Sequence, residues 1–164
     1  MFQKGNFVIS TNNGICEIQD ILIMNMSGTA KEYYLLVPID EQSAKVYIPV
    51  DLAENRIRPV ITKDEALEII KNIPAIDAVW IENEKEREKT YKDALASRDT
   101  TRLISIIKTL YLRKKERTDA GKKNTAVDER YFKLAENQLH AELAFALGEE
   151  KQNIQKIIID HITN

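Results

Sequence analysis

The stretch IRPVITKDEALEII, residues 57–70, decides how the chain is divided, because its hydrophobic pattern changes at Thr62. Before Thr62, apolar and β-branched residues follow one another as in a short strand. After it, apolar residues recur at helical spacing. The pattern TKDE is typical of a capping box, in which the Thr62 hydroxyl accepts a backbone hydrogen bond while Glu65 reaches back. The sequence therefore predicts two domains, residues 1–61 and residues 62–164.

The part before this point contains five short β-rich runs that are separated by turn residues. The runs cover residues 6–10, 15–24, 33–39, 45–50 and 57–61. In the second run the alternation is incomplete, since Ile18 and Ile21 are out of phase. Short strands at this spacing predict a small, strongly curved barrel of the SH3 or Tudor type.

The part after this point has the pattern of an all-α domain with about five helices. Its helix signals are predicted starts at Thr62, Asp99 and Thr125 and predicted stops at Pro74, Gly121 and Gly148. A charged helix over residues 83–97 and a short terminal helix around residues 154–162 complete the set. The expected fold class is therefore α+β, with an SH3/Tudor-like barrel followed by an all-α domain.

The composition fits a globular protein of the cytoplasm. Hydrophobic residues make up 43% of the chain and charged residues 30%. No apolar run approaches the roughly 18 residues that a membrane helix needs, and the N-terminus lacks the pattern of a signal peptide. The single cysteine, Cys16, lies in a predicted strand, where a thiol usually packs as a small apolar group, and it indicates a reducing compartment. We expect a cytoplasmic protein without a membrane partner.

The residue groups that catalysis needs are poorly represented. His140 and His161 lie far apart on predicted helices, without nearby partners of the metal-ligand type. The five glycines are isolated, so they form no phosphate-binding loop. The alternating acids and bases of residues 82–89 fit ion pairs on a solvated helix better than an acid–base pair. We therefore expect a protein that is not an enzyme and uses no cofactor, metal or small-molecule substrate.

Positive charge is concentrated in the middle of the chain. Residues 80–125 contain thirteen bases and eight acids, whereas the chain as a whole carries a net charge of −2. Much of this excess lies on one predicted amphipathic helix and just beyond its end, at Lys108, Arg113, Lys114, Lys115, Arg117, Lys122 and Lys123. Such a cluster can contact phosphate, but a solvated helix face and the negative end of the helix dipole also explain part of it.

Trp80, the only tryptophan, lies between Pro74 and the charged helix. Two interpretations of this residue are open. The indole either packs as an anchor of the helical domain, or it is exposed and stacks on or wedges beside bases. Apolar wedges of this kind unstack a base step and stabilise bent or opened duplex from the minor groove.

Short motifs recur through nearly the whole chain in a characteristic order. They are FQKGNFV at 2–8, KEYYLL at 31–36, VYIPV at 46–50, IRPV at 57–60, YK at 91–92, LASRD at 95–99, IIKTLYLR at 106–113 and the segment from Asp128-Glu129 to Glu142-Leu143-Ala144. Their joint order and spacing resembles the CarD/CdnL family of bacterial transcription regulators.

The resemblance implies a Tudor-like RNA polymerase-interacting domain over residues 1–61 and a helical DNA-binding domain over residues 62–164. The first would dock on the β subunit of RNA polymerase, and the second would touch promoter DNA near the upstream edge of the melted region. The resemblance also implies that Trp80 is a minor-groove wedge that slows collapse of the bubble. The phosphate contacts that it implies are Arg87, Lys89 and Lys92, with Arg113 and Lys114 as a second group.

Several positions depart from the family pattern. Asn13 precedes Gly14 where the family has histidine, and Arg98 replaces the glycine of the motif S-G-D. Trp80 lies about one helical turn farther from Ser97 than the family spacing, so its role depends on an insertion.

The predicted polymerase contacts depart from the pattern as well. Tyr47 replaces an arginine that often contacts polymerase, and another family arginine falls near Met24. Docking through Met24, Tyr47, Ile48 and Pro49 therefore depends on strand pairing along an exposed barrel edge, which uses backbone groups more than side chains.

Two hypotheses of function follow from the sequence. In the first, the protein binds the RNA polymerase β subunit and promoter DNA near the upstream edge of the bubble, and thereby stabilises the open complex. In the second, it is a protein–protein adaptor that uses the Tudor-like domain without direct DNA binding.

Overall fold

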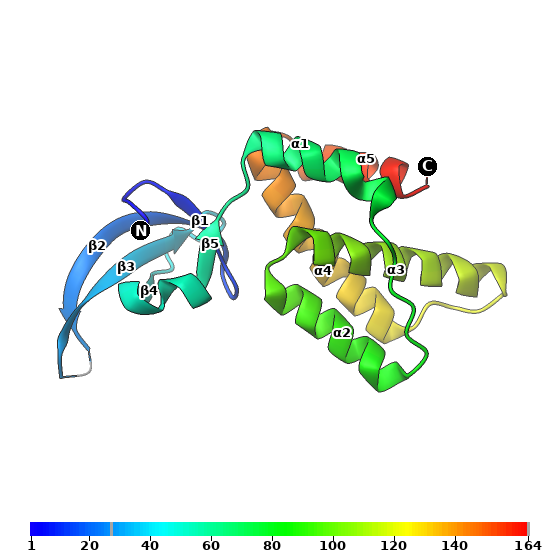
Figure 1. Cartoon of the computed structure of the whole chain (residues 1–164), viewed down its shortest axis with the longest axis horizontal. Coiled ribbons are helices and arrows are strands. Elements are labelled where there is room, and N and C mark those ends of the chain that lie inside the picture. Colours follow the sequence, from blue (N-terminus) through cyan, green and yellow to red (C-terminus); the bar gives the residue numbers. More distant parts are fainter. Residues whose placement is uncertain (27, 164) are drawn as a thin grey trace. The chain divides into compact units, whose positions relative to one another are not determined.

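The computed structural model describes residues 1–26 and 28–163. The chain divides into two compact units, Met1–Val60 and Ile61–Asn164, which are called the β-domain and the helical domain below. Figure 1 shows their elements. The expected α+β class is confirmed, since strands make up the first unit and α-helices the second.

The β-domain is one antiparallel sheet with the strand order β4-β3-β2-β1-β5. Its elements are β1 (Phe7–Ser10), β2 (Gly14–Asn25), β3 (Ala30–Pro38), β4 (Val46–Pro49), the 3-10 helix η1 (Val50–Asn55) and β5 (Ile57–Pro59). The sheet is open, whereas the strand spacing predicted a barrel. Among the described residues β4 and β5 are the two edge strands, and they do not pair with each other to close the sheet. The 3-10 helix η1 contacts both of them.

A β-bulge in β2 explains the incomplete alternation of its sequence. Ile18 pairs with Leu36 and Asp20 with Leu35, so the strand holds one extra residue between these pairs. The extra residue shifts the phase of the pleat, because successive side chains point to opposite faces. Ile18 before the bulge and Ile21 after it therefore both pack in the core of the β-domain, although an odd number of positions separates them.

The core of this domain collects apolar side chains from every strand and from η1. Its buried members are Val8, Cys16, Ile18, Tyr34, Leu36, Ile48, Ala53 and Ile57. Cys16 is fully buried, as predicted for a thiol that packs as an apolar group, and burial raises its pKa to about 11. Its thiol is therefore un-ionised and unreactive at neutral pH.

The helical domain contains five α-helices and one 3-10 turn in its described residues. They are α1 (Lys63–Asn72), η2 (Ile73–Ala75), α2 (Glu84–Ser97), α3 (Thr100–Asp119), α4 (Ala126–Leu147) and α5 (Lys151–Thr163). The largest core cluster joins side chains of α1, η2, α3, α4 and α5, and a smaller one joins α2, α3 and α4. In Figure 1 the long helices α3 and α4 lie against each other, in agreement with their contacts.

The predicted helix starts are confirmed by the capping bonds. The Thr62 hydroxyl accepts from the backbone N–H of Glu65 at 3.1 Å, and the Glu65 carboxylate accepts from the N–H of Thr62 at 3.1 Å, which completes the capping box. The side chains of Asp99 and Thr125 also accept backbone N–H bonds at the starts of α3 and α4. Arg98, in the place of the family glycine, adopts a left-handed conformation with φ 57°, which is the conformation that glycine tolerates best.

The buried carboxylate of Glu142 on α4 fixes the beginning of the helical domain. Its Oε2 accepts a hydrogen bond from the backbone N–H of Ile61 at 3.0 Å. The same α4 carries Asp128 and His140, which are also buried.

Within residues 1–26 and 28–163, no helix combines the length and the apolar character needed to cross a lipid bilayer.

His140 makes the stability of the protein depend on pH. Burial, followed by the charge of Lys151, lowers the pKa of its imidazole from 6.5 to about 4. Between about pH 4 and pH 6.5 the imidazole of His140 is therefore protonated in the unfolded state and neutral in the folded state. Stability that is fully present above pH 6.5 decreases as the pH falls towards 4, by up to about 3 kcal/mol for this one group. We expect His140→Leu to remove this component of the pH dependence, as measured by urea unfolding across the range.

The control for this experiment is His161→Leu, because His161 on α5 is only partly buried and its Nδ1 lies 2.7 Å from the carbonyl oxygen of Ile157. This variant replaces a histidine that is only partly buried, so it controls for the substitution itself. Equal slopes for the parent and His140→Leu would contradict the assignment.

Candidate nucleic-acid interface

Trp80 lies in an extended segment that joins η2 to α2. Its side chain is 57% exposed, and the neighbouring Val79 is 40% exposed. An anchor that serves only to fill a core would be covered, since burial of the indole is what stabilises such a residue. The segment therefore presents the indole to solvent, and its position depends on what holds the backbone.

Side chains from α3 hold the segment on its N-terminal side. The Ser105 hydroxyl donates to the carbonyl oxygen of Asp77 at 2.6 Å, and the Thr109 hydroxyl accepts from the backbone N–H of Val79 at 2.8 Å. These two residues lie four apart on α3, so they share one face of the helix. The backbone on the N-terminal side of Trp80 is thus fixed along α3.

Lys108, also on α3, is buried and bonds the backbone at the end of η2. Its Nζ donates to the carbonyl oxygens of Ile73 at 2.7 Å, Ile76 at 2.6 Å and Pro74 at 3.3 Å. Carbonyls at the end of a helix have no partner within the helix, and a cation there also favours the negative end of the dipole. The prediction that Lys108 belongs with the solvated bases of this helix was therefore wrong. The residue is only 9% exposed, and its ammonium group bonds backbone carbonyls inside the domain.

Arg87 on α2 holds the segment on the other side of Trp80. Its Nη1 donates to the carbonyl oxygens of Ile81 at 3.0 Å and Glu82 at 3.3 Å. Trp80 is thus placed by a clamp of α3 side chains before it and an α2 arginine after it. This arrangement orders the backbone that carries an exposed indole, on a stretch that has no regular secondary structure.

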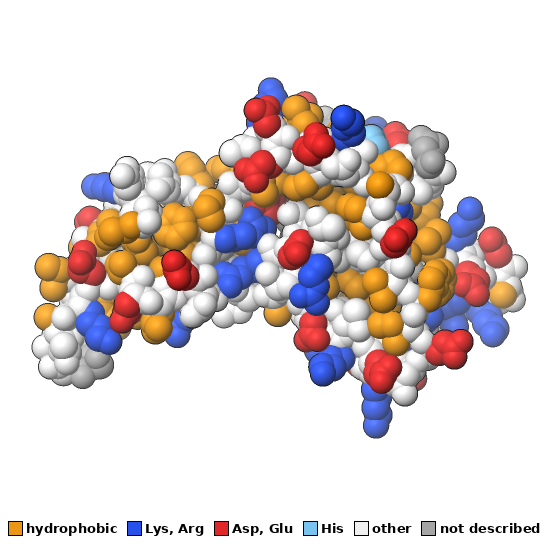
Figure 2. All heavy atoms as spheres, viewed as in Figure 1, with side chains coloured by type: hydrophobic (Ala, Val, Ile, Leu, Met, Phe, Trp, Pro, Cys, Tyr) orange, Lys and Arg blue, Asp and Glu red, His pale blue; other side chains and the backbone are white. Residues whose placement is uncertain are grey.

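A groove lies beside the indole, with a volume of about 450 Å³. Its lining comes from the Trp80 segment, α2, α3 and the loop after α3, and comprises Trp80, Ile81, Glu82, Arg87, Arg113, Glu116, Arg117, Ala120 and Lys122. Four cations and two carboxylates therefore face one space. Figure 2 shows Lys and Arg side chains interspersed with Asp and Glu around the end of α3, at the right of the view.

The structure brings three of the predicted DNA-contacting residues together at this groove, namely Trp80, Arg87 and Arg113. Arg113 is largely buried and forms an ion pair with Asp128, in which its Nε lies 2.9 Å from Oδ2. Tyr91 approaches the other carboxylate oxygen at 3.4 Å, and burial together with the Asp128 charge raises the pKa of Tyr91 to about 12. Arg113 thus joins α3 to α4 as well as lining the groove.

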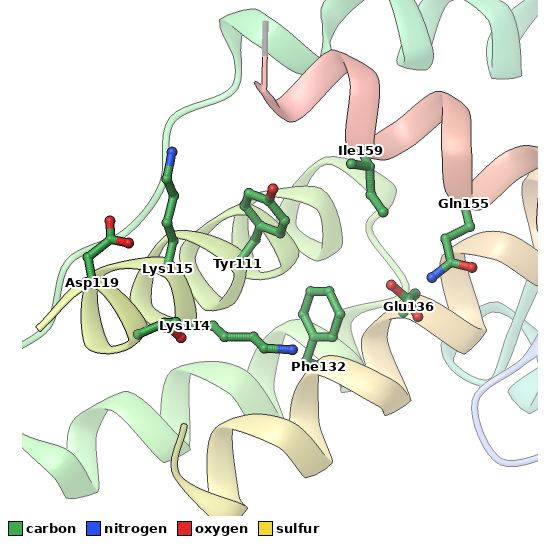
Figure 3. Close-up of a pocket in the computed structure, with 9 residues that line it drawn as sticks. Tyr111, Lys114, Lys115, Asp119, Phe132, Glu136, Gln155 and Ile159 are labelled. Carbon is green, nitrogen blue, oxygen red and sulfur yellow. The ribbon is translucent and has the colours of Figure 1, made fainter. Parts of the chain in front are cut away.

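The other three predicted residues lie outside this groove. Lys89 is exposed on α2, and Lys92 pairs with Glu88 one turn earlier at 3.8 Å. Lys114 lines a different pocket between α3, α4 and α5, where Figure 3 shows its side chain extending towards Phe132. Glu136 lines the same pocket, and burial raises the pKa of its carboxyl.

Arg117 and Lys122 line the groove; they belong to the predicted basic cluster but were not among the six residues predicted to contact DNA. Arg117 follows Arg113 by four residues, so helical spacing alone places both on one face, and this signal could have selected it over Lys114. Its Nε also donates to the carbonyl oxygen of Lys123 at 2.8 Å, which orders the loop after α3. Lys122 follows the end of α3, and no periodic pattern in the sequence assigns it to a face.

The predicted polymerase contacts occupy two places on the sheet. Tyr47, Ile48 and Pro49 belong to the edge strand β4, which pairs with β3 on one side. Tyr47 and Pro49 are partly exposed, whereas the side chain of Ile48 is buried in the core and leaves only its backbone for a partner. Met24 lies on β2 opposite Lys31 of β3, so it is separated from β4 by a strand.

Residues 2–61, which cover nearly all of the β-domain, match the family model of the CarD-like/TRCF RID domain. The β-domain is therefore a domain of the CarD-like/TRCF RID type, and such a domain indicates a transcription-related protein that interacts with RNA polymerase. Within this class its β-domain belongs to the CarD-like family, and the resemblance inferred from sequence is confirmed for these residues. The helical domain lies outside the match, and a search of curated proteins finds no match to the chain.

Proposed function

We propose that the protein is a non-enzymatic transcription regulator that stabilises the open promoter complex. Its β-domain, with a Tudor-like architecture, contacts the β subunit of RNA polymerase. Its helical domain contacts promoter DNA near the upstream edge of the melted region. No chemical step is needed, because preferential affinity for melted and bent DNA lowers the free energy of that state.

The edge strand β4 supports the polymerase half of this proposal. The RID domain family interacts with the RNA polymerase β subunit, and a strand with one side open can add to a partner's sheet through backbone hydrogen bonds. Tyr47 is partly exposed on this strand and supplies an aromatic contact where the family arginine is missing. Backbone pairing explains how docking survives the loss of that arginine.

The single observation that carries the DNA half is the exposed indole of Trp80 at the edge of a groove with four cations. Cations attract phosphate independently of sequence, and an indole stacks on or beside a base. The clamp from Ser105, Lys108, Thr109 and Arg87 fixes the backbone on both sides of Trp80 before DNA arrives. Preorganisation of this kind lowers the entropic cost of binding.

A second candidate function is an adaptor that binds polymerase and leaves DNA alone. The net charge of −2 and the carboxylates of Glu82 and Glu116 in the groove favour it, since both oppose the approach of phosphate. The adaptor predicts no salt-dependent affinity for any DNA.

The polymerase contact is tested by capture of RNA polymerase on the immobilised full-length protein. We expect the parent protein to retain polymerase through its β subunit, as identified by crosslinking. Tyr47→Ala should lower the affinity roughly tenfold, because exposed tyrosines at the centre of interfaces are among the residues that contribute most.

The matched control is Leu134→Ala, which removes an exposed apolar side chain from the helical domain instead. It should leave polymerase binding unchanged. Failure of the parent protein to retain polymerase would contradict the proposed function as a whole, whereas an unchanged affinity of Tyr47→Ala would contradict only the assignment of the β4 edge.

A further inference from the structure

The pocket between α3, α4 and α5 lies on another face of α3 from the groove beside Trp80 (Figure 3). We propose that this pocket binds an α-amino acid with an apolar side chain, whose carboxylate pairs with Lys114 and whose ammonium group pairs with Glu136. The site goes beyond the proposed function, because its ligand is neither DNA nor polymerase. The amino acid is bound and released without a chemical step.

The size of the pocket fits one small molecule. Its volume of about 360 Å³ lies near the lower end of the range of small-molecule sites, which is roughly 300 to 1,000 Å³. Three partly buried side chains form an apolar wall, namely Tyr111 from α3, Phe132 from α4 and Ile159 from α5. Figure 3 shows them pointing towards one another across the pocket. The side chain of an apolar amino acid would cover this wall, and burial of that surface stabilises the complex.

Two opposite charges face this apolar space from different helices. Lys114 extends from α3 towards Phe132, and Glu136 lies one turn after Phe132 on α4. Among the described residues, no ion pair joins Lys114 to Glu136, and neither side chain forms a hydrogen bond. A ligand with one group of each sign can therefore lie between them and pair with both.

The carboxylate of Glu136 lacks a partner that offsets its burial. Burial raises its pKa, and the charge of Lys114 opposes this effect only in part. An added ammonium group is attracted more strongly by such a carboxylate than by one in bulk water, because solvent screens the charges less. Gln155 reaches the pocket beside Glu136 from α5, and its amide oxygen is a further acceptor for the ammonium group.

Ligands with a single charge suit the pocket less well. An apolar amine would pair with Glu136 but would also face the ammonium group of Lys114, and an apolar acid would face the carboxylate of Glu136. Lys115 and Asp119 also line the pocket, and their opposite charges offset each other. The charges of the four side chains therefore favour a zwitterion over either ion.

Occupation of the pocket makes the stability of the helical domain depend on the amino acid. The ligand contacts α3, α4 and α5 at once, and these helices lie together only in the folded domain. A ligand that binds the folded state and not the unfolded state stabilises the former by mass action. The unfolding temperature therefore rises with the concentration of the amino acid.

The experiment titrates the full-length protein with L-phenylalanine and with three compounds that each lack one part of it. Phenethylamine lacks the carboxylate, hydrocinnamate lacks the ammonium group, and glycine lacks the apolar body. NMR chemical shifts measure the affinity and locate the ligand, since the ring signals of Tyr111 and Phe132 should move. We expect phenylalanine to bind roughly tenfold tighter than any of the three, because one hydrogen bond to a charged group has an effect of this order.

Two variants test the pairing of the charges. Lys114→Met should bind phenylalanine roughly tenfold more weakly and phenethylamine no more weakly than the parent protein does. Glu136→Gln should show the same pattern with phenylalanine and hydrocinnamate. The matched controls are Lys115→Met and Asp119→Asn, since Figure 3 shows both side chains directed away from Phe132. These controls should keep the affinity of the parent protein for phenylalanine.

Several results would overturn the amino-acid site. One is the absence of any shift at Tyr111 and Phe132 up to the solubility limit of phenylalanine. Another is an affinity for phenethylamine or hydrocinnamate that equals or exceeds the affinity for phenylalanine. An equal loss in Lys114→Met and Lys115→Met would contradict the pairing of Lys114 with the carboxylate. The proposed function is unaffected by these outcomes, because it is tested by the binding of polymerase and DNA.

Discussion

Replacement of Trp80 by alanine should lower the affinity of the protein for a forked promoter duplex roughly tenfold or more. Contact between one base and an aromatic side chain contributes about 1–3 kcal/mol, and the Trp80 indole is 57% exposed for such a contact. The same change should shorten the lifetime of the open complex formed by polymerase on that promoter. The first effect is measured by fluorescence anisotropy of labelled DNA, and the second by challenge with a competitor.

The salt dependence of binding distinguishes the indole from the cations around it. Trp80→Ala should leave the slope of log K against log salt unchanged, because it removes no phosphate contact. Arg117→Ala and Lys122→Ala should each reduce the slope by about one. Lys115→Ala serves as the control of equal charge, since Lys115 lines the other pocket of α3.

Two results would contradict the role of Trp80. One is an unchanged affinity and open-complex lifetime in Trp80→Ala, provided that the variant unfolds at the same denaturant concentration as the parent protein. The other is an equal loss for fully paired duplex and fork, since a wedge or a stacked base acts on melted DNA. Trp80→Phe, which keeps an aromatic ring, should recover part of the loss.

Local signals in the sequence predicted the ends of the helices well. Thr62, Asp99 and Thr125 cap α1, α3 and α4 in the structure, because a cap requires a side-chain oxygen within a few residues of the N–H groups that it satisfies. Gly148 ends α4 in the left-handed conformation that the sequence indicated. Such features depend on neighbours in sequence, and one chain contains all the information they need.

Features that depend on distant segments were predicted less well. The bulge in β2 appeared in the sequence only as an irregular alternation, and the pairing with β3 was needed to explain it. The open edge between β4 and β5 could not be read from strand spacing, because closure depends on the path of η1. The loss of phase was visible in the sequence, but its cause was not.

The candidate site was also predicted only in part, because it depends on segments that are distant in sequence. Trp80 and Arg113 could be selected from residue type and charge, and the structure places both at one groove. Lys114 is adjacent to Arg113 in sequence but turns to another face of α3. Lys108 belongs to the same run of bases, but its ammonium group bonds backbone carbonyls inside the domain. A charge count cannot distinguish such a lysine from one that is exposed to solvent.

The exposed indole therefore depends on buried contacts elsewhere in the helical domain. The segment around Trp80 has no regular secondary structure, and backbone groups in it form hydrogen bonds with side chains of α2 and α3. A buried backbone group without a partner is costly, so these side chains determine both the path of the segment and its stability. Among them Lys108 makes the largest number of bonds, because it serves three carbonyls.

Replacement of Lys108 by methionine should lower the free energy of unfolding by about 2–4 kcal/mol. Methionine keeps most of the apolar stem but removes the ammonium donor from the carbonyl oxygens of Pro74 and Ile76, and it leaves the carbonyl oxygen of Ile73 with the backbone N–H of Ile76. Each hydrogen bond to a charged group contributes about 1.5–3 kcal/mol, and part of the loss is offset because a buried charge no longer has to be desolvated. Urea unfolding measures the change.

Lys115→Met is the matched control, because it removes an exposed lysine from the same helix and should change the stability by less than about 0.5 kcal/mol. A second measurement separates positioning from stability. In Lys108→Met at low temperature, where the protein stays folded, the fluorescence anisotropy of Trp80 should fall and fork affinity should drop with it. A variant as stable as the control, with unchanged anisotropy, would show that the three carbonyls find water instead and that Lys108 does not position the indole.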